Sequence, residues 1–331
     1  MRIAVDAMGS DRAPAVEVEG AVGALLDRPD TTVVLVGDRA VVEAELARHP
    51  EAPRERIEVV DAPDVIEMGE PPAQAVRRKP RSSIVVGTRL VKSGEADAFL
   101  SAGSTGAVMA AAHFILRPLP GVDRPAVGSA IPTATGKTFL IDMGANVDTR
   151  PQHLRQFAHL GTIYAEDLMR VESPRVGLLN IGEEPEKGNE KTLEAYGLLS
   201  RDPDLNFVGN IEGREVIKGR CDVLVCDGFV GNILLKFYES MAGFLGGLLR
   251  DEMEAQGVRL DLDRIWSRLD YSSYGGAPLL GVNGVVVISH GGSPPQAIRN
   301  GIGVAAQSVE RGMVGHIARR LAELADSPEI A

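Results

Sequence analysis

Cysteine is scarce in this 331-residue sequence, which contains only Cys221 and Cys226. The two are separated by four residues, and neither has the companion Cys or His pair that a zinc site requires. We therefore expect both thiols to be reduced and structural, and we expect no metal site.

Positive charge is also in deficit, since 35 Lys and Arg face 46 Asp and Glu, for a net charge of -11. A nucleic-acid partner needs a basic face to neutralise phosphates, so this class of partner is excluded. The same charge is an obstacle to any acidic protein partner unless positive charge is concentrated locally.

Long hydrophobic runs are absent as well. The longest, Gly106 to Leu116, is too short to span a bilayer, and Asp6 interrupts the region where a signal peptide would need apolar residues. The sequence is therefore expected to be cytoplasmic. Its length and its 44% hydrophobic content suit one sizeable globular core.

Short runs rich in Val and Ile alternate with amphipathic stretches along the whole chain. The expected strands are Ile3 to Ala7, Thr32 to Val36, Ile57 to Val60, Ala98 to Leu100, Ala126 to Ile131, Thr138 to Met143, Arg175 to Ile181, Val223 to Cys226 and Val285 to Ser289. The expected helices are Pro14 to Leu26, Arg39 to Arg48, Ile84 to Ser93, Thr105 to Leu116, Pro151 to Val171, Glu190 to Leu199 and Pro295 to Ala325. This alternation predicts a three-layer α/β fold with a largely parallel sheet between helices, and no linker divides residues 1–331 into separate domains.

One region departs from that alternation. A long helix is expected over Asn232 to Gln256 and a shorter one over Leu260 to Leu269, with apolar residues at helical spacing and glycines in the middle of the first. We expect this pair, residues 232–269, to project from the sheet and to pack on a second copy of the chain.

Gly, Ser and Asn recur directly after the expected strands. The loops concerned are Met8 to Asp11, Ser101 to Gly106, Gly144 to Asp148, Asn180 to Glu190, Asp227 to Asn232 and Ser289 to Ser293. Each loop alone fits an ordinary turn or helix cap. Their recurrence at the ends of successive strands, where α/β sheets bind ligands, instead favours a site for a phosphate-sized anion.

Nucleotide-binding motifs are not convincing here. Gly136-Lys137-Thr138 resembles the end of a P-loop, but Ile131 stands where the first glycine is required. The glycines at 301 and 303 lie inside a helical stretch, well past a strand. We therefore expect no NAD, ATP or other cofactor.

Candidate catalytic side chains are few. His290 follows an apolar strand and precedes two glycines, and Lys187 near a helix start could reach a phosphate or a developing oxyanion. Lys187 could equally be an exposed residue in an acidic loop. Cys226 is a poor nucleophile, because neighbouring Asp227 would raise the pKa of its thiol.

Motifs along nearly the whole chain resemble those of the phosphate acyltransferases of bacterial phospholipid synthesis, the PlsX family. The matching segments are Val5 to Gly9, Ala75 to Lys79, Ser101 to Gly106, Asp142 to Asn146, Asn180 to Glu184, Lys187 to Glu190, Asp227 to Asn232, Tyr274 to Gly284 and His290-Gly291. Ser10 and Ser104 depart from the Gly and Asn that the family often has, and Gly292 to Pro295 replaces a more serine-rich stretch. These changes bear on fine specificity and leave the chemistry intact.

The resemblance implies transfer of an acyl group from acyl carrier protein to inorganic phosphate, without cofactor, by a homodimer. It implies a fold similar to phosphotransacetylases and isopropylmalate dehydrogenases, and a product used by a membrane glycerol-3-phosphate acyltransferase. The expected catalytic residues are Lys187, His290 and Asn232. The residues expected to bind phosphate and the acyl thioester are Asp6, Gly9, Ser101, Gly103, Ser104, Thr105, Gly106, Asn146, Asn180, Glu184, Asp227 and Gly228.

Three alternatives remain open. The chain could be a phosphate acetyl- or butyryltransferase acting on acyl-CoA, or a non-catalytic scaffold that brings fatty-acid enzymes to the membrane. A decarboxylating dehydrogenase is disfavoured, because no nicotinamide fingerprint and no carboxylate cluster for Mg²⁺ is apparent.

Two basic sets are candidates for docking the acidic carrier, although both also fit solvated helix faces. They are Arg77, Arg78, Lys79 and Arg81, and Arg259, Arg264 and Arg268. The tip of the helical pair, Gly257 to Leu262, is a candidate for peripheral membrane contact, and Trp266 is a candidate either for that contact or for the dimer core. The acidic Asp251, Glu252 and Glu254 favour dimerisation over lipid binding there.

Overall fold

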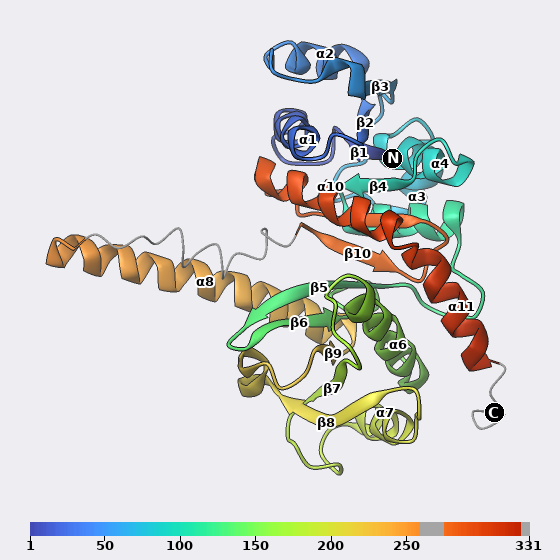
Figure 1. Cartoon of the computed structure of the whole chain (residues 1–331), viewed down its shortest axis with the longest axis vertical. Helices are drawn as coiled ribbons and strands as arrows, with labels where there is room; N and C mark the ends of the chain where they lie inside the picture. The colour runs from blue at the N-terminus through green and yellow to red at the C-terminus, as the bar shows by residue number, and fades with distance from the viewer. Residues whose placement is uncertain (259–274, 326–331) are drawn as a thin grey trace. The chain divides into compact units, whose positions relative to one another are not determined.

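A computed structural model describes residues 1–258 and 275–325 of the chain (Figure 1). Internal contacts group these residues into two compact units. Unit 1 holds residues 1–127, 166–170 and 275–325, and unit 2 holds residues 128–165 and 171–258. The expectation of one catalytic domain over residues 1–331 stays a prediction.

Unit 1 is built on strands in the order β3-β2-β1-β4-β11-β10. Their bounds are β1 (Arg2–Asp6), β2 (Thr32–Gly37), β3 (Ile57–Asp61), β4 (Ala98–Ser101), β10 (Ala277–Leu280) and β11 (Val285–Ile288). The pairings from β3 through β11 are all parallel, with Val5 beside Leu35 on one neighbour and Leu100 on the other. Only β10 runs antiparallel, against β11 and against the first two residues of β5 (Ala126–Thr133).

Helices pack on both faces of the unit 1 strands because successive strand residues point to opposite sides. Leu100 faces Gly301 of α10, whereas Phe99 faces Gly87 of α4, and at both places the glycine makes room for the larger side chain. The helices of unit 1 are α1 (Ala15–Asp27), α2 (Arg39–Leu46), η1 (Arg54–Arg56), α3 (Pro72–Arg78), α4 (Ser83–Ser93), α5 (Thr105–Ala111), η2 (Ala112–Leu116), α10 (Pro295–Glu310) and α11 (Met313–Ala325).

Unit 2 contains strands in the order β5-β6-β9-β7-β8. The strands added here are β6 (Gly136–Ile141), β7 (Arg175–Asn180), β8 (Asn206–Glu212) and β9 (Val223–Val225). β5 and β6 form an antiparallel hairpin, and β6, β9, β7 and β8 are parallel. The loops after β6, β9 and β7 therefore leave the same edge of the sheet.

The helices of unit 2 are α6 (Pro151–Asp167), α7 (Glu190–Ser200), η3 (Gly213–Lys218) and α8 (Gly228–Gln256). α6 packs closely on the strands through Gly161, which lies against Val223, while Tyr164 stacks on Phe139 at 4.0 Å between ring centroids. α8 extends well beyond the strands of its own unit (Figure 1).

The α/β class and the largely parallel sheet predicted from the sequence are confirmed, and each expected strand is present within one or two residues of its predicted bounds. The helix α3, the strands β8 and β10 and the short 3₁₀ helices η1 and η3 were not predicted. The helix expected over Thr105 to Leu116 changes to π geometry at Ala112, and the one expected over Pro295 to Ala325 is two helices, because Gly312 takes a left-handed φ of 62° between them.

The long projecting helix is present, but it begins at Gly228 and not at Asn232, because Asp227 caps it. The second helix of the predicted pair, Leu260 to Leu269, lies outside the described residues. So do Arg259, Arg264, Arg268, Trp266 and the tip beyond Val258.

Candidate functional site

In unit 1 the buried carboxylate of Asp6 organises the ends of β1 and β4. The Ser101 hydroxyl donates to Asp6 Oδ2 at 2.6 Å and accepts the Gly103 N–H at 3.0 Å, while the Met8 N–H donates to Asp6 Oδ1 at 3.1 Å. Burial raises the pKa of Asp6 above its usual range, against the hydrogen bonds from Ser101, Ser83 and Met8. Asp6 thus fixes the two loops from within.

Gly9 allows these two loops to touch. A Cβ at Gly9 would lie 2.6 Å from the Gly103 nitrogen and 2.8 Å from Asp6 Oδ2, so any other residue would push the loops apart. Ser104 caps α5 by accepting the Ala107 N–H at 3.4 Å. Asp6, Gly9 and the 101–106 loop thus contact one another within unit 1, and their binding of a ligand stays a prediction.

The loop carrying His290 joins the same edge. The Ser289 N–H donates to the Ser101 carbonyl at 2.8 Å, and the Asp11 N–H donates to the Gly291 carbonyl at 2.9 Å. His290 itself is exposed. Its imidazole therefore stands at the rim of a cluster made by the ends of β1, β4 and β11.

Glu17 belongs to this cluster but was missed in the sequence. It lies on α1, fully buried, and its Oε1 accepts the Ser10 N–H at 2.8 Å while Oε2 has no hydrogen-bond partner. Burial raises the pKa of Glu17 to about 7, with a smaller contribution from the charge of Asp6. A Glu in a helical pattern reads as a solvated residue, so no local signal singles it out.

In unit 2 the buried Asp142 organises the loop after β6. Its Oδ1 accepts the N–H groups of Gly144 (3.3 Å) and Ala145 (3.1 Å). Its Oδ2 accepts both the backbone N–H of Asn146 (2.7 Å) and the Asn146 side-chain amide (2.9 Å). The carboxylate thus determines where Asn146 lies, although only Asn146 was predicted as a site residue.

Asp227 connects three segments at the start of α8. Its Oδ1 accepts the Val230 N–H at 2.9 Å, and its Oδ2 receives the Lys191 ammonium at 3.2 Å. The next residue, Gly228, donates its N–H to the Asn146 carbonyl at 2.8 Å. Asn232 lies one turn further on, beside Gly144, so the loops after β6 and β9 and the start of α7 meet here.

The predicted residues after β7 have different roles. Asn180 donates to the Lys187 carbonyl (2.9 Å) and to Asn210 Oδ1 (3.1 Å), and its own Oδ1 accepts the Ile181 N–H (2.9 Å). Its amide therefore holds the loop that carries Lys187 and Glu184, both of which are exposed. The Asn180 amide therefore positions the loop through hydrogen bonds, and Lys187 is a cation that the loop exposes.

Cys226 is fully enclosed behind these loops. Burial raises the pKa of its thiol well above the usual range, and the carboxylates of Asp142 and Asp227 raise it further. Burial likewise raises the pKa of the Cys221 thiol to about 12. Neither thiol has the low pKa that a nucleophilic cysteine needs.

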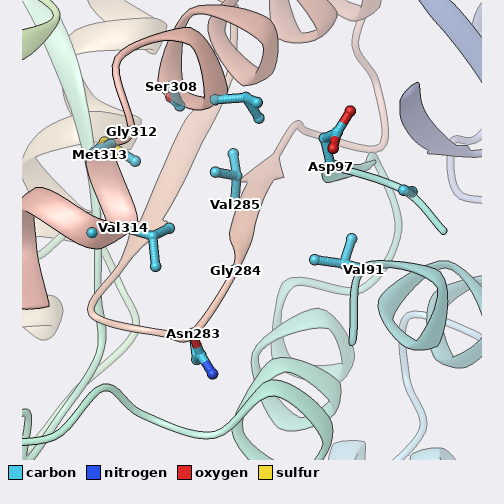
Figure 2. A pocket seen from close by; sticks show the side chains of 12 residues that line it. Val91, Asp97, Asn283, Gly284, Val285, Ser308, Gly312, Met313 and Val314 are labelled. Carbon is cyan, nitrogen blue, oxygen red and sulfur yellow. The ribbon is translucent and has the colours of Figure 1, made fainter. Parts of the chain in front are cut away.

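A cavity of about 280 Å³ in unit 1 lies away from the loops that follow β1, β4 and β11 (Figure 2). Its lining includes Asp97 and Gly284, which precede β4 and β11, so it opens at the amino ends of these strands. The ligand sites of α/β sheets lie at the opposite edge. Within residues 1–258 and 275–325, no three His, Cys, Asp or Glu side chains are grouped to hold a metal ion, and no helix is both long and apolar enough to cross a membrane.

Solved structures share this fold. A phosphotransacetylase from Streptococcus pyogenes aligns with a TM-score of 0.62 at 20% identity, covering 94% of each chain. A branched-chain phosphotransacylase from Enterococcus faecalis aligns at 0.59 and 14% identity, covering 93% of this chain and 99% of its own. The fold is therefore that of the phosphotransacetylases, as the sequence predicted.

Sequence relatives are much closer. Residues 1–316 match the family described as "Fatty acid synthesis protein". A protein of Heliobacterium modesticaldum named phosphate acyltransferase is 50% identical over 325 residues, 96% of each chain. Another of that name, from Desulfitobacterium hafniense, is 50% identical over 330 residues, 97% of this chain and 98% of its own. The chain belongs to this fatty acid synthesis protein family.

Proposed function

We propose that this chain is a phosphate acyltransferase that converts acyl-[acyl carrier protein] and inorganic phosphate to an acyl phosphate and free carrier protein. The observation that carries this proposal is the family match over residues 1–316, with relatives of that name at 50% identity over nearly the whole chain. The product would supply a membrane glycerol-3-phosphate acyltransferase.

The reaction needs no enzyme nucleophile. A phosphate oxygen attacks the thioester carbonyl carbon, a C–O bond forms, and the C–S bond breaks to release the carrier thiolate, which takes up a proton. The site must hold one anion while it stabilises a second as the oxyanion forms. The inaccessible, high-pKa Cys226 agrees with direct attack.

We assign phosphate and acyl-thioester binding to the residues expected from the sequence, taken unit by unit. In unit 1 these are Asp6, Gly9 and the Ser101, Gly103, Ser104, Thr105 and Gly106 loop; in unit 2 they are Asn146, Asn180, Glu184, Asp227 and Gly228. We assign catalysis to Lys187, which would stabilise the oxyanion, and to His290 and Asn232. Asp6, Asn180 and Asp227 would serve by holding the loops, since their polar atoms are already bonded to them.

The proposal is tested by incubating the purified chain with dodecanoyl-[acyl carrier protein] and ³²P-phosphate. Labelled dodecanoyl phosphate and free carrier thiol should form in equal amounts. Thiol release without labelled acyl phosphate would indicate a thioesterase, and a Cys226→Ser variant should retain most of the wild-type rate. Trapping an acyl-cysteine would contradict direct attack.

A second candidate is a phosphate acetyl- or butyryltransferase that uses acyl-CoA, because solved structures of the same fold are named phosphotransacetylase and branched-chain phosphotransacylase. Likeness at 14–20% identity shows the fold alone. The two are separated by comparing kcat/KM for acetyl-CoA and for dodecanoyl-[acyl carrier protein]: preference for acetyl-CoA would favour the second candidate.

We place the docking of the acidic carrier on α3. Of the four cations at the end of α3 and directly after it, Lys79 is paired with Glu70 and Arg81 with Asp61, whereas Arg77 and Arg78 on α3 are exposed and Arg77 lies 5.1 Å above the Phe114 ring. Reversing Arg77 and Arg78 to Glu should raise KM for the carrier-bound donor and spare dodecanoyl-pantetheine. An equal rise for both donors would indicate phosphate binding instead.

We propose that α8 mediates a homodimer. Phe237, Phe244 and Leu248 are 63%, 58% and 51% exposed, and they lie on one side of the helix because they are seven and four residues apart. Phe244→Asp with Leu248→Asp should yield monomer in sedimentation, while Leu26→Asp on α1, also exposed, should not. An unchanged dimer would move the interface elsewhere.

We propose peripheral membrane contact near the end of α8, where Val258 is 45% exposed. Flotation with anionic vesicles tests it. No flotation of the wild type, or flotation unaffected by Val258→Glu, would leave α8 with the dimer contact alone.

A further inference from the structure

Three loops leave one edge of unit 2 side by side. β9 pairs in parallel with β6 on one side and with β7 on the other, so the loops that follow these strands are neighbours. The Gly228 N–H to Asn146 carbonyl hydrogen bond joins the loop after β9 to the loop after β6. The Lys191 to Asp227 ion pair joins the loop after β9 to α7, the helix that follows the loop after β7. The polar residues described above arise from these same loops.

The same three loops also expose large apolar side chains. Val147, in the loop after β6, is 60% exposed, and Ile181, directly after β7, is 81% exposed. Phe229 and Ile233, one turn apart at the start of α8 after β9, are 57% and 54% exposed. Each side chain is adjacent in sequence to a residue of the polar cluster: Asn146, Asn180, Gly228 and Asn232.

Single exposed apolar residues are ordinary on protein surfaces, but their concentration beside a polar site is not. Ile181 contributes little to any core at this exposure, and it precedes a loop containing Glu183, Glu184 and Glu186. Ligand sites commonly combine apolar walls with a few polar groups that fix orientation. An amphipathic ligand with a reactive polar end and an aliphatic body matches this arrangement.

We propose that Val147, Ile181, Phe229 and Ile233 form the surface that receives the aliphatic chain of the acyl donor. This inference rests on the proposed function, because the donor is taken to be a long-chain thioester whose carbonyl meets the polar residues of the same loops. Contact with these side chains then selects long chains over short ones.

The test uses Ile181→Ser and Phe229→Ser, with Ile217→Ser as the matched control. Ile217 is 57% exposed in the same unit, but its carbonyl accepts the Ala134 N–H at the β5–β6 turn, at the opposite edge of the strands. Each protein is assayed with phosphate and with dodecanoyl- or butanoyl-pantetheine, which removes any effect of carrier docking.

We expect each strand-end variant to lower kcat/KM for the dodecanoyl donor about tenfold, and the ratio of dodecanoyl to butanoyl kcat/KM by nearly as much, because a short chain reaches less of this surface. Ile217→Ser should leave the ratio unchanged. An unchanged ratio in Ile181→Ser and Phe229→Ser would overturn the inference.

A binding measurement separates this inference from the proposed function. S-dodecyl-pantetheine, a thioether that cannot react, should bind the wild type more tightly than Ile181→Ser or Phe229→Ser in calorimetry. If the thioether binds in this way but the wild type shows no turnover, the proposed function is contradicted and the inference about the apolar surface is retained. Equal binding would overturn the inference, and variants that become monomeric with unchanged chain preference would assign the surface to a second copy of the chain.

Discussion

Asp142→Asn tests whether one buried carboxylate supports the candidate site of unit 2. The two Asp142 oxygens accept four N–H donors from Gly144, Ala145 and Asn146. Asparagine has nearly the same shape, but one of its two terminal atoms is an NH₂ group that donates. Whichever way the amide is oriented, it turns a donor toward donors and leaves at least two N–H groups, buried or part-buried, without this acceptor.

The expected loss of stability follows from those bonds. Hydrogen bonds to a charged group contribute about 1.5–3 kcal/mol each, and part of the loss is recovered by the two bonds that remain. We expect Asp142→Asn to cost about 2–4 kcal/mol, seen as a lower urea midpoint at unchanged slope. The displaced loop carries Asn146, so kcat/KM should fall as well.

The matched control is Asp204→Asn, which makes the same chemical change at an exposed position of unit 2. It should alter stability by less than about 0.5 kcal/mol. If the two variants had equal urea midpoints, the four short distances at Asp142 would not represent stabilising hydrogen bonds, and the argument for this loop would fail.

Two further predictions concern unit 2. Lys187→Ala should lower turnover about 10²- to 10³-fold with an unchanged melting temperature, and unchanged turnover would move oxyanion stabilisation to His290 or to backbone donors. Burial favours a raised pKa for Asp202, but His159 Nε2 at 2.8 Å and Arg155 Nε at 2.6 Å outweigh it and lower the pKa to about 2. The contribution of ionised Asp202 to the free energy of unfolding should therefore be lost as the pH falls from about 4 to about 2. In acid-unfolding curves, Asp202→Asn should show a smaller decrease in stability over this range than the wild type.

The fold was largely predictable because its inner strands are apolar on both faces. β1, β2, β4 and β9 read as short Val, Ile, Leu and Phe runs, which parallel strands between helix layers require. The missed strands lack that signal. β8 alternates exposed and half-buried residues in its first four positions and contains Gly209, and β10 is only four residues long and includes Pro278.

The candidate site was predictable at the level of loops and less so at the level of individual groups. Gly, Ser and Asn after strands pointed to the carboxyl ends of the strands within each unit, where the structure gathers these loops. The sequence could not show that the Asn180 amide is already bonded to Lys187 and Asn210, or that Asp142 holds Asn146. Such assignments depend on which donors face each carboxylate or amide after folding.

Glu17 gives a prediction in which stability changes with pH in the opposite direction to Asp202. Its pKa is raised from an ordinary value of 4.5 to about 7 because burial disfavours the charged form. A group whose pKa is raised by folding contributes fully to the free energy of unfolding at a pH below its pKa in the unfolded state. This contribution is lost as the pH rises through its pKa in the folded state. The difference between these two values corresponds to about 3 kcal/mol lost between pH 4.5 and pH 7.

Glu17→Gln keeps an oxygen for the Ser10 N–H but cannot ionise, so its melting temperature should rise relative to the wild type between pH 5 and pH 8. Because Glu17 supports Ser10 in the loop beside Asp6, a difference that stayed constant over this range would show that Glu17 is already ionised at pH 5 and that the loop rests on a carboxylate.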